Sequence, residues 1–183
     1  YDLYGQMYNA PLYKLLGGYR NKIITDITIS VNEPEEMARD SIDAVKRGFD
    51  TLKIKVGKES SKDIERMKAI RKAVGYDVNL RIDANQAWKP KEAVKILRKM
   101  EDEGLNVEFV EQPVEAHDID GLKFVTDNVS IPVLADESVF SPGDALKILQ
   151  ERSADFVNIK LMKTGGIHNA LKICSVAEIY GVE

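Results

Sequence analysis

Five short apolar runs recur along the chain, and a charged residue stands near the end of each. They read TLKIKVG, NLRIDAN, VEFVEQP, VLADES and FVNIKL, with the charged residues Lys55, Asp83, Glu111, Asp136 and Lys160. Successive charged residues lie 24 to 28 positions apart, enough for one strand, one helix and two short loops. The spacing therefore predicts a repeated strand–helix unit that brings five charged groups to one rim of a parallel sheet.

Helix signals fill the intervals between these runs. Pro34, Pro90 and Pro142 suit the first turn of a helix, and glycines follow several of the periodic stretches. We expect strands over residues 22–31, 51–57, 79–85, 107–113, 131–138 and 155–161. We expect helices over residues 35–48, 60–75, 90–104 and 119–129, from 142 onward, and over 166–180. The strand interiors are apolar almost throughout, as in a parallel sheet covered on both faces.

The position of the charged residues favours a (β/α)8 TIM-type barrel over an open doubly wound sheet. In a barrel all strand ends converge on one site, whereas an open sheet gathers its ligand residues at one switch point. No glycine-rich nucleotide-binding loop is present to support the second fold. A barrel needs eight strands and this chain supplies about six, with residues 181–183 as the possible start of a seventh. We therefore expect the chain to be a segment of a longer polypeptide.

Composition excludes several classes of partner. The 183 residues are 44% hydrophobic and carry a net charge of −4, with basic residues scattered among acidic ones. A nucleic-acid partner would require a clustered basic face, and a membrane span would require about 20 apolar residues in a row. The single cysteine, Cys174, cannot form an internal disulfide and fits a reducing cytosol. We expect a cytoplasmic protein with no nucleic-acid or membrane partner.

Three of the five charged residues are acids that predict a metal site. Asp83, Glu111 and Asp136 would present hard oxygen ligands from three adjacent strands, with no histidine or cysteine beside them. Such a ligand set favours Mg²⁺ over zinc. Alternatively, each acid caps a helix or binds backbone amides, but three acids in phase favour the metal site.

The lysines on either side of the acids predict acid–base chemistry. Lys53 and Lys55 alternate along one strand, so both amines point into the barrel. Neighbouring cations lower each other's pKa, and one amine then becomes a usable base. Lys160 comes from the opposite side of the site, although all three lysines could instead be salt-bridge partners of the acids. Two bases around a metal suggest removal and return of a proton next to a carboxylate, as in racemisation or epimerisation. A single base would suit elimination or cycloisomerisation.

The motifs LKIKVG, RIDANQAW, VEQPV, ADESVF and NIKLMKTGG resemble those of the enolase superfamily, in its muconate-lactonizing subgroup. Within that subgroup the segment is most similar to the dipeptide epimerases that act on L-Ala-D/L-Glu. The resemblance implies that Lys55 and Lys160 are opposing general acid/bases. It also implies Mg²⁺ as cofactor, with the ligands Asp83, Glu111 and Asp136.

The resemblance also implies a division of the chain into segments, and position in the sequence suggests supporting roles for four further residues. Residues 1–21 would be a linker and helix end from a capping domain, and residues 22–183 a partial barrel catalytic domain. Lys53 would tune the electrostatics of the site, and Trp88 would anchor a loop. Two further side chains are expected to orient the ligands beside them, namely Asn85 and Glu137.

Several alternatives remain open at this point. Cycloisomerases, o-succinylbenzoate synthases and N-acylamino acid racemases share the five rim residues. A Schiff-base aldolase would need one reactive lysine and no metal, and an inactive truncated scaffold would need neither. Dipeptide epimerases also bind the substrate ammonium through an Asp-x-Asp pair on the eighth strand. Because that pair does not lie in this chain, we expect little activity from the chain alone. The expected substrate is a dipeptide carboxylate, and the expected enzyme is a homo-oligomer.

Overall fold

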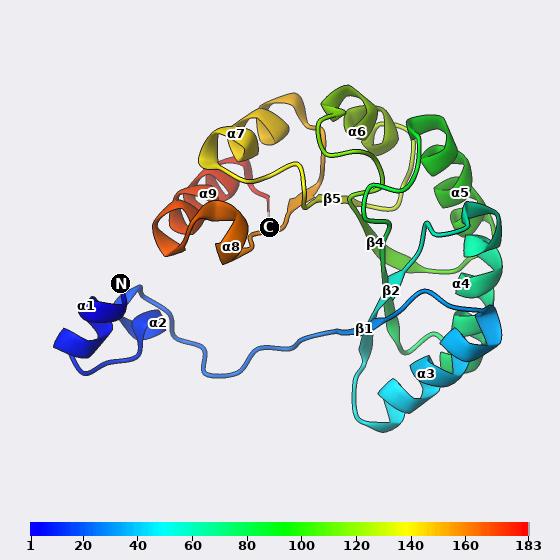
Figure 1. The fold of residues 1–183 in the computed structure, drawn as a ribbon, viewed down its shortest axis with the longest axis horizontal. Coiled ribbons are helices and arrows are strands. Elements are labelled where there is room, and N and C mark those ends of the chain that lie inside the picture. The colour runs from blue at the N-terminus through cyan, green and yellow to red at the C-terminus, as the bar shows by residue number, and fades with distance from the viewer. Residues whose placement is uncertain (183) are drawn as a thin grey trace.

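The computed structural model describes residues 1–182, in which six parallel strands lie side by side (Figure 1). The strands are β1 (Ile27–Ile29), β2 (Thr51–Lys55), β3 (Asn79–Asp83), β4 (Val107–Glu111), β5 (Val133–Ala135) and β6 (Phe156–Val157). Their order in the sheet is their order in the sequence, without the reversal at a switch point that an open doubly wound sheet shows. Figure 1 shows the helices along the outer side of this curved row of strands.

The helices occupy the intervals that the sequence predicts. Preceding the sheet are α1 (Asp2–Met7) and α2 (Leu12–Leu15). Between and after the strands lie α3 (Pro34–Lys46), α4 (Ser60–Val74), α5 (Pro90–Asp102), α6 (Ile119–Thr126), α7 (Pro142–Glu151), α8 (Leu161–Thr164) and α9 (Ile167–Tyr180). Proline occupies the first turn of α3, α5 and α7, because its missing N–H would have no partner there in any case.

Three strands, β1, β5 and β6, are much shorter than expected, and the fifth, expected over residues 131–138, extends only over Val133–Ala135. The first was expected over residues 22–31, but only Ile27–Ile29 pair with β2, and Ile23 and Ile24 are largely exposed. The sixth was expected over residues 155–161, but pairing with β5 ends at Val157. β1 and β6 each have one paired neighbour within residues 1–182, so half of their backbone groups gain nothing from extension. The expectation of a seventh strand over 181–183 extends beyond the described residues, because Glu183 is not among them.

One face of the sheet is apolar and packs against the helices, whereas the other carries charged side chains together with Phe109, Leu134 and Phe156, which corrects the expectation of strands that are apolar throughout. Along β2, Leu52 and Ile54 are fully buried, whereas Lys53 and Lys55 alternate with them and are partly exposed. The core therefore lies between the strands and the helices. Its fully buried members include Leu52, Ile54, Met67, Ile70, Leu80, Ile82, Leu97, Met100, Val110 and Leu122.

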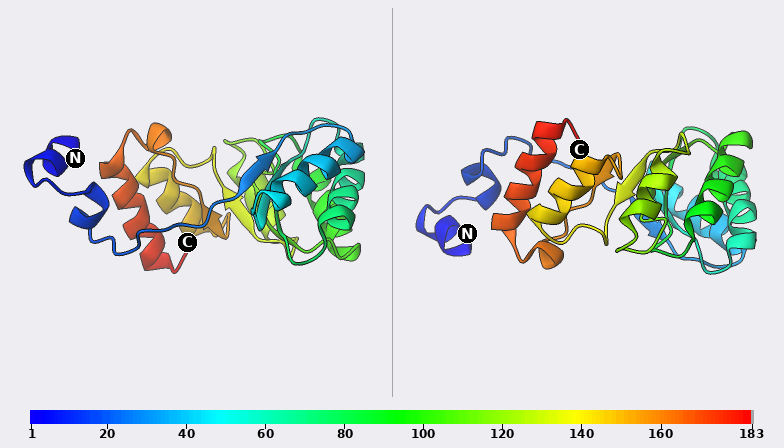
Figure 2. Two further views of the ribbon diagram at one scale, coloured as in Figure 1. Left: turned by 90° about the horizontal axis from the view of Figure 1, so that it is seen from below. Right: turned by 90° about the horizontal axis from the view of Figure 1, so that it is seen from above.

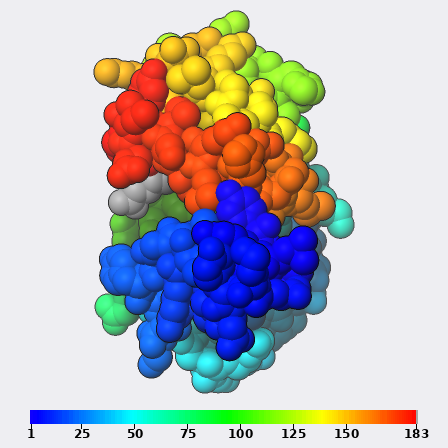
Figure 3. Space-filling view, turned by 90° about the vertical axis from the view of Figure 1, so that its left-hand side faces the viewer, coloured from blue at the N-terminus to red at the C-terminus, as the bar shows by residue number. Residues whose placement is uncertain are grey.

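The N-terminal helices stand apart from the sheet. After α2, residues 17–26 form no helix or strand and run along the molecule to β1 (Figure 2). In Figure 3 the blue N-terminal segment lies directly beside the orange segment that contains α8. Within residues 1–182, none of the helices combines the length and the apolar character required to cross a membrane.

Candidate active site

The carboxyl ends of the strands bring the five predicted rim residues together. Lys55, Asp83 and Glu111 are the last residues of β2, β3 and β4. Lys55 is the register partner of Asp83, and Asp83 is the register partner of Glu111. Asp136 directly follows β5, and Lys160 precedes the first residue of α8. The parallel strands thus place a rim of charged residues at their carboxyl ends.

The three carboxylates of the rim are almost completely buried. The exposed fraction is 1% for Asp83, 2% for Glu111 and 0% for Asp136. Lys53 bridges the first two, with its Nζ 2.9 Å from Asp83 Oδ2 and 2.5 Å from Glu111 Oε2. A buried charge requires a partner, and each of these carboxylates has at least one ammonium group beside it.

Lys55 is held by the end of β3 and by the loop that follows it. Its Nζ donates to Asp83 Oδ2 at 2.7 Å and to Asn85 Oδ1 at 2.5 Å. Asn85 in turn donates from Nδ2 to Glu137 Oε1 at 3.0 Å, and its backbone has a positive φ of 43°. The structure therefore places Asn85 against Lys55, whereas Glu137 contacts Asn85. The other carboxylate oxygen of Glu137 is buried without a hydrogen-bond donor among residues 1–182.

Two lysines from the first turn of α8 converge on Asp136. Lys160 Nζ donates to Asp136 Oδ2 and lies 3.9 Å from Glu111 Oε1. Lys163 Nζ lies 2.5 Å from Asp136 Oδ1 and 2.5 Å from the Asp136 carbonyl, and it also donates to Asn158 O at 3.1 Å. Asn158 completes the connection, because its Nδ2 donates to Glu111 Oε1 at 3.2 Å.

Sequence reasoning assigned no role to Lys163, Asn158 or Gln112. Gln112 is fully buried, and its Oε1 accepts from the backbone N–H groups of Asp136 and Ser138. The signals were present in two cases. Asn158 and Lys160 share one side of an extended segment by alternation, and Lys160 and Lys163 have the spacing of neighbours on a helix.

The pKa values of the carboxylates reflect their mutual proximity. Burial raises the pKa of Glu111, the charge of Asp83 and the hydrogen bond with Asp136 raise it further, and Lys53 opposes them. Burial also pushes the pKa of Asp136 upward, but the hydrogen bonds from Lys160 and Lys163 outweigh it, and the net pKa lies below its ordinary value. Glu111 and Asp136 therefore titrate as an interacting pair.

The expectation that neighbouring lysines lower each other's pKa does not hold for Lys53. Burial lowers the pKa of Lys53, but its hydrogen bonds to Glu111 and Asp83 outweigh burial and raise the pKa above its ordinary value. The pKa of Lys160 is raised in the same way, by Asp136 against burial, and the charge of Lys53 lowers it only in minor part. Two carboxylates lie within 2.5 to 2.9 Å of Lys53 Nζ, so attraction dominates.

The rim has the ligand chemistry of a hard divalent cation, although its carboxylates do not surround one point. No group of three Asp, Glu, His or Cys side chains within residues 1–182 has the arrangement of a metal site. The reason is that Lys53 lies between Asp83 and Glu111, and Lys160 lies between Glu111 and Asp136. Three buried carboxylates with no other donor type nevertheless fit Mg²⁺, which would replace the ammonium groups as their shared partner.

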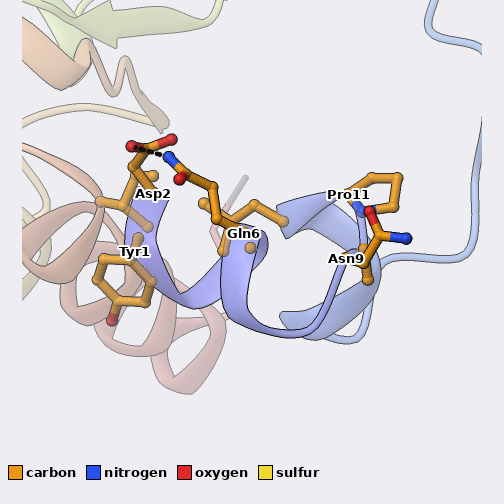
Figure 4. Close-up of a pocket in the computed structure, with 9 residues that line it drawn as sticks. Tyr1, Asp2, Gln6, Asn9 and Pro11 are labelled. Carbon is orange, nitrogen blue, oxygen red and sulfur yellow. Dashed lines mark hydrogen bonds between the residues drawn. The ribbon is translucent and has the colours of Figure 1, made fainter.

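Two hollows lie near or beyond this rim. A cavity of about 500 Å³ on the polar face of the sheet is bounded by Lys53, Glu111 and Asn158, and it reaches the ion pair of Arg81 with Asp26. A second hollow of about 610 Å³ lies between the N-terminal helices and Ile167 (Figure 4). There Gln6 donates to Asp2 at 2.8 Å. Only the first of these cavities is lined by rim residues.

Known proteins resemble this chain in both sequence and structure. Residues 36–183 match the family described as Enolase C-terminal domain-like. Over 183 residues the chain is 70% identical to the L-Ala-D/L-Glu epimerase of Clostridium acetobutylicum, covering all of this chain and 51% of that protein. The chain thus spans about half the length of the curated relatives it matches.

Solved structures give the same result. A substrate-liganded complex of the L-Ala-D/L-Glu epimerase from Bacillus subtilis matches with a TM-score of 0.98 at 58% identity, over 100% of this chain and 51% of that one. The dipeptide epimerase from Enterococcus faecalis, complexed with Mg and the dipeptide L-Leu-L-Tyr, matches with a TM-score of 0.96 at 54% identity, over 100% and 51%. These matches confirm the predicted fold class, in which the chain contributes six strand–helix units of a TIM-type barrel.

Proposed function

Because the chain belongs to the Enolase C-terminal domain-like family, we propose that it is part of a Mg²⁺-dependent epimerase acting on dipeptides of the L-Ala-D/L-Glu type. One observation carries this proposal: Lys55 and Lys160 stand at opposite ends of a row of three buried carboxylates. The names of the relatives support the choice of a dipeptide as substrate. The activity is proposed for the full-length protein, since the chain spans about half the length of those relatives.

Asp83, Glu111 and Asp136 are the residues that would hold the ion. When bound, Mg²⁺ supplies positive charge to the carboxylate of the substrate as the neighbouring proton leaves. Solved dipeptide epimerases complexed with Mg support this assignment. Lys53, bonded to both Asp83 and Glu111, adds a second positive charge to this end of the site.

Lys55 and Lys160 transfer the proton. One amine removes the α-proton of the C-terminal residue, and the electron pair of the broken C–H bond moves into the carboxylate, which gives an enediolate. The ammonium group of the other lysine then donates a proton to the opposite face of the α-carbon, and the configuration inverts. Asn85 accepts a hydrogen bond from Lys55 and so fixes the direction of that amine.

The test uses the full-length protein with Mg²⁺ and L-Ala-D-Glu in D₂O, followed at the Glu α-proton by NMR. We expect loss of the α-proton signal together with formation of L-Ala-L-Glu, and no reaction in EDTA. Lys55→Ala and Lys160→Ala should each abolish inversion, but each should still exchange the α-proton of one diastereomer, and not the same one. Exchange of different diastereomers by the two variants would indicate two bases that act on opposite faces of the α-carbon.

Two results would contradict the proposal. If the dipeptide α-proton persists while an N-acylamino acid or a cyclohexadiene carboxylate reacts, the protein performs another reaction of the muconate-lactonizing subgroup. If no carboxylate exchanges its α-proton at all, the rim has no acid–base function.

A further inference from the structure

A buried ion pair, which the proposed reaction does not use, lies where three successive loops of the rim meet. Asp63 and Arg66, one turn apart near the start of α4, are 0% and 1% exposed, and Arg66 NH1 donates to Asp63 Oδ1 at 2.9 Å. Trp88, which is 2% exposed, completes the cluster. Figure 1 shows α4 on the outer side of the sheet, so the pair is separated from the polar face that carries the lysines.

Asp63 joins the loop after β2 to the loop after β3. Its Oδ2 accepts from the backbone N–H of Gly57 at 3.0 Å and from the indole Nε1–H of Trp88 at 3.2 Å. These loops touch closely, because a Cβ on Gly57 would lie 2.3 Å from the Cβ of Ala87. Gly57 also has a φ of +92°, which side chains disfavour. The close approach of the two loops therefore requires glycine at position 57, and the Asp63 carboxylate holds the loops together.

Arg66 extends the cluster to a third loop. Its Nε donates to Asn32 O at 2.9 Å, in the loop after β1, and its NH1 donates to Glu59 O at 3.1 Å, just before α4. One ion pair thus connects the loops that follow β1, β2 and β3. Buried ion pairs are often no more stabilising than apolar side chains of the same volume, because desolvation opposes their attraction. The contribution of this pair is therefore to the positions of the loops, since each of its hydrogen bonds to a loop holds that loop in place.

The loops fixed in this way are those that hold Lys55. Lys55 lies two residues before Gly57, and its hydrogen-bond partners Asp83 and Asn85 lie shortly before Trp88. Lys160 depends on Asp136 and Glu111 instead. The side-chain hydrogen bonds of Asp63 and Arg66 within residues 1–182 reach neither of those acids.

From this arrangement we propose that the Asp63–Arg66–Trp88 cluster is a positioning device for Lys55, and that it governs proton transfer on one face of the substrate only. The inference rests on the proposed function, because it requires two lysines that act on opposite faces. It adds an asymmetry to that function: damage to the cluster should slow one base and spare the other.

The test compares two buried arginines of the same helix in the full-length protein. Arg66→Lys changes the cluster, and Arg71→Lys is the matched control, because Arg71 is 3% exposed and binds backbone carbonyls at the opposite end of α4. Trp88→Phe is a milder third variant that removes the indole N–H. It leaves the backbone bond from Trp88 to Pro113 O in place. Exchange of the α-proton in D₂O is measured separately from L-Ala-L-Glu and L-Ala-D-Glu.

For Arg66→Lys and Trp88→Phe we expect exchange from the diastereomer served by Lys55 to slow by about 10- to 100-fold. Exchange from the diastereomer served by Lys160 should stay within about twofold, and Lys55→Ala and Lys160→Ala identify which diastereomer is which. Arg71→Lys should change both rates by the same factor. Equal slowing of both diastereomers by Arg66→Lys and Trp88→Phe would overturn the inference, as would the same asymmetry in Arg71→Lys. A wild-type protein that exchanges neither diastereomer would refute the proposed function itself, and the inference with it.

Discussion

Lys163, in the one-turn helix α8, holds the carboxylate of Asp136 from the side opposite to Lys160. Its side chain is 7% exposed, and its Nζ contacts Asp136 Oδ1, Asp136 O and Asn158 O. The amine also lies 5.7 Å from the centre of the Phe140 ring. With its hydrogen-bonding capacity used in this way, Lys163 serves as an orienting partner of a proposed metal ligand.

Replacement of this residue should weaken the response of the enzyme to Mg²⁺. Lys163→Met keeps much of the side-chain volume but releases Asp136 Oδ1. Loss of such an orienting partner typically lowers metal affinity or activity by about 10- to 100-fold. We therefore expect the Mg²⁺ concentration for half-maximal epimerisation to rise by about this factor. Lys172→Met, on the exposed face of α9, is the control and should match the wild type. An unchanged Mg²⁺ requirement in Lys163→Met would show that Asp136 needs no such support.

At the level of single residues, alternation along strands was sufficient to predict the rim. Lys53, Lys55 and Asp83 lie at strand positions whose direction is fixed by a period of two. Lys163 could not be assigned in this way, because its direction depends on where β6 ends. Pairing stops at Val157, so α8 begins at Leu161 and turns Lys163 back toward Asp136. That boundary depends on the neighbouring strand, which local sequence does not reveal.

Among the elements, α4 contacts loops at the carboxyl ends of the strands and loops at their amino ends. Asp63 and Arg66, near its start, bind the loops that follow β1, β2 and β3, whereas Arg71 lies toward its end. Arg71 donates to four backbone carbonyl groups, at 2.6 to 3.0 Å, which belong to Gly75, Val78, Leu105 and Asn106. These carbonyls lie in the loop before β3 and the loop before β4. The planar guanidinium can reach all four at once, and an ammonium group cannot.

Arg71→Lys should therefore destabilise the protein without altering its stereochemical preference. Several buried carbonyls would lose their donor, and we expect the free energy of unfolding to fall by about 2–4 kcal/mol. Urea denaturation of the full-length protein, followed by circular dichroism, measures the change. Arg39→Lys, at an exposed position of α3, should change it by less than about 0.5 kcal/mol. Comparable stability of Arg71→Lys and Arg39→Lys would mean that the four carbonyls find other donors.

For the elements, the sequence predicts the bounds of β2, β3 and β4 better than those of β1, β5 and β6. The strands β2, β3 and β4 occur within the expected ranges because apolar residues pack against α4 and α5 there. The outer strands were predicted too long because composition alone cannot report whether a neighbouring strand is present. The buried Asp63–Arg66 pair was also missed. Its partners are backbone groups of three loops, and loops place backbone groups without a periodic signal.

Over the whole molecule, the rim gathers three buried carboxylates and four amines, those of Lys53, Lys55, Lys160 and Lys163. The order of the strands was predictable from the spacing of the charged residues. Which amine binds which carboxylate was not predictable. These contacts depend on how far each side chain reaches across neighbouring strands and on the balance between the cost of burying charges and their mutual attraction.

Addition of Mg²⁺ should stabilise the folded full-length protein. An ion that binds only the folded state at about 100 times its Kd adds about 2.7 kcal/mol, which corresponds to a rise in Tm of several degrees for a protein of this class. Differential scanning calorimetry with Mg²⁺ and with EDTA measures the difference. Asp136→Asn should abolish the rise, and Asp127→Asn, an exposed acid paired with Lys123, should preserve it. A Tm that is insensitive to Mg²⁺ in a protein active with Mg²⁺ would contradict the ligand assignment.

The alternation of β2, in which Leu52 and Ile54 face the helices while Lys53 and Lys55 face the polar side, has a consequence for evolvability. Residues that specify the architecture and residues that specify the reaction occupy opposite sides of the same strand. We expect a substitution at the polar positions to alter the proposed chemistry and to leave the packing between strands and helices in place. We therefore expect that a change of chemistry on this scaffold requires few mutations and leaves its fold in place.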